Sequence, residues 1–152
     1  MIIRRVSFDG FLNDRSNPIH LKLLQMTRIN CGIPVQSLSD KHLLAEHREI
    51  KRICFRLSVR LSSNNFQDIP TDFSVVKNGK IVFKELFWLD KGKYTLNRYN
   101  QIYNECLRRG FKVTDFSSNW EIYKKKPEFF KDYNPTEEQI SMIQKRINEK
   151  LK

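Results

Sequence analysis

The sequence predicts a mainly α-helical protein, a compact single domain of three helices with little or no sheet. Three segments place apolar residues at intervals of three, four and seven, which is the period of a helix that buries one face. The segments between them carry turn residues, and only one short hairpin is indicated. The chain of 152 residues is long enough to bury one hydrophobic core and short for two.

The first helix is predicted to begin at Ser39 and to carry two opposite faces. Its apolar stripe consists of Leu43, Ile50, Cys54, Leu57 and Leu61. On the other side an arginine recurs at every fourth residue, at Arg48, Arg52, Arg56 and Arg60. We call these four residues the arginine ladder. At about 100° per residue, His42, Glu49 and Arg56 lie almost on one line. The carboxylate of Glu49 is therefore expected on the same polar face as the arginine ladder.

The middle of the chain is expected to be irregular from Ser62 to Asp90, apart from one hairpin. Residues 73–77 and 80–86 can pair across Asn78-Gly79, because this dipeptide suits a type I′ turn. A second helix is predicted from about Lys93 to Arg109, where Gly110 provides a C-terminal stop. Its apolar face would be formed by Leu96, Tyr99, Tyr103, Cys106 and Leu107.

The last part of the chain is expected to form a loop and then a third helix. The loop spans residues 111–133 and is rich in aromatic side chains. The helix is predicted to start at Thr136, which can form a capping box with Gln139. Its buried stripe would be Ile140, Ile143, Ile147 and Leu151.

The formal net charge of +11, from 28 Lys and Arg against 17 Asp and Glu, predicts an acidic partner. Nucleic acid is the commonest such partner, and an anionic membrane surface is the next. No apolar run approaches the ~20 residues that span a bilayer, so an integral membrane protein is not expected. Cys31, Cys54 and Cys106 have no zinc spacing, so we expect buried thiols in a reducing compartment and no metal site.

The arginine ladder has two interpretations that composition alone leaves open. It is either a solvated helix face with an ordinary surface pair between Glu49 and Arg52, or a surface that neutralises backbone phosphates. Only Glu46 and Glu49 lie near the four arginines in sequence. This excess of positive charge in register favours phosphate binding.

Several well-spaced blocks of sequence occur from residue 26 onward. The first two are Met26-Thr27-Arg28-Ile29-Asn30 and the stretch from Leu38 to Glu49. The others are Asp90-Lys91, Arg98, residues 105–111, residues 127–129, Asp132-Tyr133, Pro135, Arg146 and Glu149-Lys150. In this order the blocks strongly resemble the T-even phage endonuclease V family. Its members are compact three-helix proteins, pyrimidine-dimer DNA glycosylases with abasic-site lyase activity.

The resemblance implies a DNA repair enzyme that excises cyclobutane pyrimidine dimers and then incises the strand. The implied nucleophile is the α-amine of Thr27, which the family exposes by removing the initiator Met, and this amine forms an imine with the sugar. An α-amine has a pKa of about 7.7–8.0, against about 10.4 for lysine, so more of it is neutral at pH 7. Glu49 is the implied carboxylate that stabilises charge on the sugar and assists β-elimination. No cofactor or metal is implied.

The predicted DNA-binding residues combine the basic positions of the family with Arg56 of the ladder. They are Arg28, His42, Arg48, Arg52, Arg56, Arg146 and Lys150. The expected partner is double-stranded DNA that contains pyrimidine dimers or abasic sites. The protein is expected to be a monomer with no membrane partner, in the cytoplasm of a bacterial or phage-infected cell. Trp88, Trp120 and Tyr123 are expected either to lie in the core or to replace the aromatic tail of the family's type member.

Residues 1–25 precede the family-like domain at 26–152 as an extension, and they leave Thr27 internal, with an amide in place of an amine. Three accounts are open: translation begins at Met26, residues 1–26 are removed as a propeptide, or the extension stays. We favour the first account, because the family motif resumes at a Met. The third account gives a competing hypothesis, a non-catalytic basic DNA-binding protein in which the extension blocks Thr27.

Overall fold

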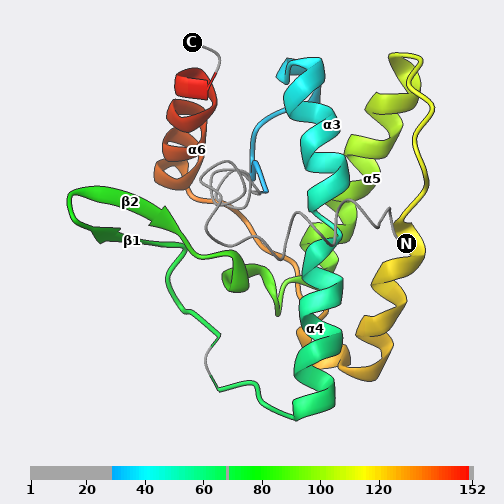
Figure 1. The fold of residues 1–152 in the computed structure, drawn as a ribbon, viewed down its shortest axis with the longest axis vertical. Helices are drawn as coiled ribbons and strands as arrows, with labels where there is room; N and C mark the ends of the chain where they lie inside the picture. The colour runs from blue at the N-terminus through cyan, green and yellow to red at the C-terminus, as the bar shows by residue number, and fades with distance from the viewer. Residues whose placement is uncertain (1–28, 68, 151–152) are drawn as a thin grey trace, which may run out of the picture.

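The computed structural model describes residues 29–67 and 69–150. Four α-helices and two strands lie within these ranges: α3 (Asp40–Glu49), α4 (Arg52–Ser63), β1 (Ser74–Lys77), β2 (Lys80–Phe83), α5 (Gly92–Arg108) and α6 (Glu137–Lys150). Four 3₁₀ helices accompany them: η1 (Val35–Ser37), η2 (Glu85–Trp88), η3 (Ser117–Lys125) and η4 (Pro127–Phe129). The predicted mainly helical fold with little sheet is confirmed (Figure 1). The predictions for residues 1–25, Thr27, Arg28 and Leu151 lie outside the described residues.

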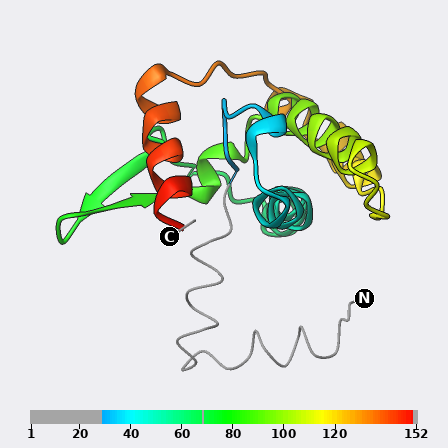
Figure 2. The same cartoon turned by 90° about the horizontal axis from the view of Figure 1, so that it is seen from above.

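Helices α3 and α4 follow each other through the middle of the molecule, and the other elements lie on two sides of them (Figures 1 and 2). On one side α5 packs against α3, and η3 packs against both α4 and α5. Helix α6 and the β1–β2 hairpin lie on the other side. None of the helices in the described ranges combines the length and the apolar composition needed to cross a bilayer.

The hydrophobic core forms where the three predicted apolar stripes meet. Its buried members from these stripes are Leu43, Ile50, Cys54, Leu57, Tyr99, Cys106, Ile143 and Ile147. All three cysteines are buried free thiols, as predicted. The prediction that Leu107 is buried is wrong, because its side chain is 48% exposed. At about 100° per residue, Leu107 points well away from the neighbouring Cys106, which faces the core.

The large aromatic residues Trp88, Trp120 and Tyr123 lie in the core. The indole N–H of Trp120 donates to Thr95 Oγ1 at 2.9 Å, and the Tyr123 hydroxyl donates to the Leu89 carbonyl at 2.8 Å. Of the two predicted roles, the core role is confirmed. These side chains cannot replace a surface aromatic tail, because they do not reach the surface.

The first predicted helix is divided in two at Ile50 and Lys51, so the expectation of one continuous helix is wrong. No proline or glycine causes the break. The Lys51 ammonium donates to the carbonyl of Arg48 at 2.7 Å, and a side chain that enters the backbone ladder is a known cause of a kink. The break affects the site described below, because Glu49 ends α3 and Arg52 begins α4.

The predicted hairpin is confirmed, with a second strand shorter than expected. Strands β1 and β2 are antiparallel neighbours. Asn78 and Gly79 both have positive φ angles, 52° and 75°, as a type I′ turn requires. Strand β2 ends at Phe83, and the chain then turns into η2 instead of continuing the ladder.

The ends of α5 and α6 follow the local sequence signals. After α5, the Phe111 N–H donates to the Cys106 carbonyl at 2.9 Å and the Gly110 N–H donates to the Leu107 carbonyl at 3.0 Å. This pair of bonds is a Schellman motif, and Gly110 has the positive φ that the motif needs.

The predicted capping box starts α6. The Gln139 N–H donates to Thr136 Oγ1 at 3.1 Å, and the Thr136 N–H donates to Gln139 Oε1 at 3.0 Å. The prediction of a plain loop over 111–133 is wrong, because η3 and η4 occupy much of it. These short 3₁₀ segments lack the long 3.6-residue period by which an α-helix is found in a sequence.

Candidate active site

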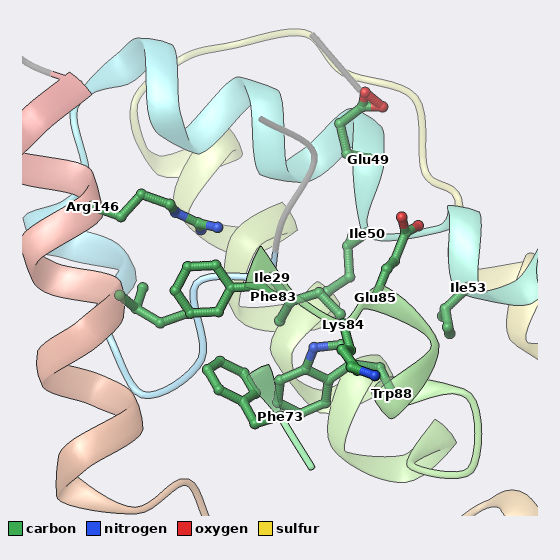
Figure 3. A pocket seen from close by; sticks show the side chains of 11 residues that line it. Ile29, Glu49, Ile50, Ile53, Phe73, Phe83, Lys84, Glu85, Trp88 and Arg146 are labelled. Atoms are coloured by element: carbon green, nitrogen blue, oxygen red, sulfur yellow. The ribbon is translucent and has the colours of Figure 1, made fainter. Parts of the chain in front are cut away.

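A cleft lies where the end of α3, the start of α4, the hairpin, η2 and α6 meet (Figure 3). Its lining residues are Ile29, Glu49, Ile50, Ile53, Phe73, Phe83, Lys84, Glu85, Trp88, Ile143 and Arg146. The cleft is partly open to solvent. The lining is mainly apolar, and its charged residues are Glu49, the adjacent Lys84 and Glu85, and Arg146.

Asn30 is fixed beside the cleft by a buried ion pair. The Glu46 carboxylate on α3 accepts hydrogen bonds from the Asn30 backbone N–H at 3.1 Å and from its Nδ2 at 2.8 Å. Arg98 on α5 donates to the same carboxylate, from Nε at 2.8 Å and from Nη2 at 3.0 Å. We call Asn30, Glu46 and Arg98 the Glu46 clamp. The clamp ties the first described residues of the chain to α3 and α5.

Helix α6 reaches the same place through Arg146. Its Nη2 donates to Asn30 Oδ1 at 2.9 Å, and its guanidinium carbon lies 4.8 Å from the centre of the Phe83 ring. Figure 3 shows Arg146 and Glu49 on the borders of the cleft, contributed by α6 and by α3. A cation from the last helix therefore shares one cleft with the predicted catalytic carboxylate.

Glu49 is the last residue of α3, and its side chain is 27% exposed. Its Oε1 lies 3.8 Å from Arg52 Nη1, and Arg56 Nη2 lies at the same distance from Glu85 Oε2. Two arginines of the ladder are thus next to the two carboxylates of the cleft. A separation of 3.8 Å is longer than the roughly 2.7–2.9 Å of a charge-assisted hydrogen bond.

The other predicted site residues either do not line the cleft or lie outside the described residues. His42 is half-buried in the first turn of α3, where its Nδ1 lies 2.9 Å from Ser39 Oγ. Arg48 is exposed on α3 and does not line the cleft. Lys150 ends α6, and its side chain is not described. Thr27 and Arg28 lie outside the described residues.

Lys51 occupies the break between α3 and α4 but is not among the lining residues. Its ammonium lies 3.9 Å from the centre of the Phe116 ring. Burial lowers the pKa of Lys51 below its usual value. Glu49 partly opposes this shift in pKa, whereas Arg48 and Arg52 add to it. The Lys51 side chain is therefore an amine with a lowered pKa next to the Phe116 ring.

Sequence patterns do not assign a role to Asn30, Glu46, Arg98 or Glu85. Arg98 follows Glu46 by 52 residues, and Arg146 follows Asn30 by 116 residues. No local periodicity can signal contacts at such separations. The one available signal for Asn30, Glu46 and Arg98 is that each lies in a block that carries the family resemblance.

We expect Gly32→Ala to destabilise the protein more than Gly110→Ala. Both glycines have positive φ, +77° and +87°, but a Cβ at Gly32 would clash with the Ile140 side chain of α6, whereas nothing lies within 4 Å at Gly110. The backbone change should cost about 1–2 kcal/mol at either position, and the overpacking at Gly32 about 1–3 kcal/mol more. Urea denaturation measures both losses. Equal losses would contradict the close packing of α6 on this segment.

In the described part of the chain, no cluster of three or more His, Cys, Asp or Glu side chains could hold a metal ion. A comparison with protein families matches residues 26–119 to the family described as pyrimidine dimer DNA glycosylase. The matched range is more than half of the chain and contains Glu49 and the whole Glu46 clamp. Helix α6 lies beyond it and joins the site through the bond from Arg146 to Asn30. The chain belongs to the pyrimidine dimer DNA glycosylase family.

Proposed function

We propose that this protein excises cyclobutane pyrimidine dimers from double-stranded DNA through an imine on the α-amine of Thr27, and then incises the strand by β-elimination. Membership of the pyrimidine dimer DNA glycosylase family supports the general activity, that of a DNA repair glycosylase that acts on DNA. The proposed imine mechanism is supported by the cleft beside Asn30, which has Glu49 and Arg146 in its lining.

The covalent chain limits how far Thr27 can be from this cleft. Ile29 lines the cleft, and Asn30 is fixed next to it by the Glu46 clamp. Two peptide units separate position 27 from Ile29, and since consecutive Cα atoms are about 3.8 Å apart, they can span at most about 8 Å. A nucleophile at position 27 is therefore within reach of a sugar bound over Glu49.

The proposed chemistry uses the free amine and one carboxylate. The neutral Thr27 amine bonds to the sugar C1′ as the glycosidic bond to the 5′ pyrimidine breaks. That base takes the bonding electrons and a proton, and it stays joined to the 3′ pyrimidine through the cyclobutane ring. The amine loses its protons as the sugar ring opens, and an imine forms. Removal of a C2′ proton then expels the 3′ phosphate, and water releases the amine. Glu49 stabilises the positive charge on the sugar and accepts the C2′ proton.

The proposed DNA-binding residues supply the charge that a phosphate backbone requires. Arg146 lines the cleft, and Arg52 and Arg56 are next to its two carboxylates. Arg28, His42, Arg48 and Lys150 are the remaining proposed contacts, and the net charge of +11 supports a polyanionic partner. The monomeric state and the cytoplasmic location stay predictions.

The test compares three forms of the protein on a duplex with one pyrimidine dimer. They are a form that starts at Thr27, a form that retains Met26 as one extra residue, and the full chain. We expect only the form that starts at Thr27 to break the glycosidic bond and incise the strand, because only it has the required amine. Binding without incision by all three forms would favour the non-catalytic alternative. Equal incision by all three would exclude the Thr27 amine as the nucleophile.

A further inference from the structure

The β1–β2 hairpin projects away from the helices (Figures 1 and 2), and it exposes apolar side chains. Val76 and Ile81 are cross-strand partners, and they are 69% and 48% exposed. Val82, on the other face of the ribbon, is 39% exposed. An isolated two-stranded ribbon with apolar residues on both faces is poorly stabilised in water and is typical of a surface that meets a partner.

The exposed end of this ribbon carries only positive charge. Lys77 and Lys80 face each other across the turn, and both are exposed. Lys84 follows the second strand, and no acidic residue occurs between Asp72 and Glu85. The charge of the hairpin therefore suits a polyanion.

The ribbon is continuous with the cleft of the candidate site. Phe83 at the end of β2 and Lys84 after it both line that cleft. Because side chains alternate along a strand, Ile81 lies on the same face as Phe83. At about 3.3 Å per residue, Lys80 lies about 10 Å beyond Phe83, which corresponds to about three base pairs along a duplex. A duplex bound over the cleft would pass along the hairpin.

We propose that the β1–β2 hairpin is a second DNA-contacting element that holds the duplex on one side of the lesion. The Val76–Ile81 pair faces the groove. Lys77 and Lys80 are the next cross-strand pair, on the opposite face of the ribbon, and their long side chains reach past the edges of the ribbon to bind backbone phosphates. The major groove of B-DNA, about 12 Å wide, admits a two-stranded ribbon, and its thymine methyl groups offer apolar contacts. This inference rests on the proposed function, because it needs DNA in the cleft.

The test measures how the affinity for a dimer-containing duplex depends on salt. Lys77→Gln/Lys80→Gln is compared with Lys124→Gln/Lys125→Gln, a pair of exposed lysines on η3 that loses the same charge. Each phosphate contact contributes about 0.9 to the slope of log K against log salt. We expect the slope to fall by about 1.8 in the hairpin variant, from the two lost contacts, and to stay unchanged in the η3 variant.

A second arm tests the apolar pair. Val76→Thr/Ile81→Thr keeps β-branched residues in both strands, so the ribbon should still form. We expect weaker binding with an unchanged salt slope, because no charge is lost. Binding as tight as that of the unchanged protein would remove these two side chains from the interface.

Failure of this inference differs from failure of the proposed function. Equal salt slopes for the two lysine variants, with normal incision by the unchanged protein, would overturn the role of the hairpin alone. No incision by the unchanged protein would overturn the proposed function itself. The inference would also be overturned if Lys77→Gln/Lys80→Gln lost binding to vesicles with anionic lipids but kept the salt dependence of its DNA affinity. That result would assign the ribbon to a membrane surface.

Discussion

Glu49→Gln is expected to lower the single-turnover rate of incision at a pyrimidine dimer by about 10²–10⁴-fold, while the affinity for the damaged duplex stays close to that of the unchanged protein. Glutamine has nearly the same size as glutamate, but it can neither carry the negative charge nor accept the C2′ proton. The rate is measured by rapid quenching with the form that starts at Thr27 in excess over DNA, and the affinity by fluorescence anisotropy.

Glu85→Gln is the matched control for this substitution. Glu85 lines the same cleft and faces Arg56, but it has no part in the proposed chemistry. We expect the control to retain most of the incision rate. Equal losses in the two variants would show that the total charge of the cleft matters, and not the position of Glu49. Normal incision by Glu49→Gln would remove this carboxylate from the mechanism.

Arg98→Met is expected to lower the free energy of unfolding by about 3–5 kcal/mol. Arg98 and Glu46 are 4% and 0% exposed, so the substitution would leave a buried carboxylate without its cation. The two hydrogen bonds from Asn30 would be its remaining partners within the clamp. Urea denaturation near pH 7 measures the loss.

Arg108→Met is the control on the same helix. Arg108 also pairs with a carboxylate, that of Glu105, but its side chain is 65% exposed. Because Arg109 Nε also lies 2.7 Å from Glu105 Oε2, this carboxylate keeps a cation when the exposed Arg108 is replaced, and we expect a much smaller loss. Adding Glu46→Gln to Arg98→Met should restore part of the stability, since it removes the unpaired buried charge. A loss for Arg98→Met no larger than that for Arg108→Met would contradict the clamp.

The predictions from sequence succeed where neighbouring residues carry all the information. The capping box at Thr136, the turn at Asn78-Gly79 and the stop at Gly110 each depend on residues within a few positions of one another. The apolar stripes succeed for the same reason, because a helix fixes the relative direction of residues three and four apart. Glu49 and Arg146, which the family resemblance singles out, both line one cleft in the structure.

The features that escape prediction depend on tertiary contacts. The break between α3 and α4 has no proline or glycine that would indicate it in the sequence. At this break the ammonium of Lys51 donates to the backbone carbonyl of Arg48. The Glu46 clamp joins residues from three separate segments, and the cleft needs α6 to fold back onto Asn30. A sequence pattern records none of these distances.

Borohydride trapping shows whether the Thr27 α-amine forms the imine. The form that starts at Thr27 is incubated with an abasic-site duplex, reduced with borohydride, digested and mapped by mass spectrometry. We expect one covalent adduct, on the α-nitrogen of Thr27, and none for the form that retains Met26. An adduct on a lysine such as Lys51, or incision without any trapped adduct, would contradict this expectation.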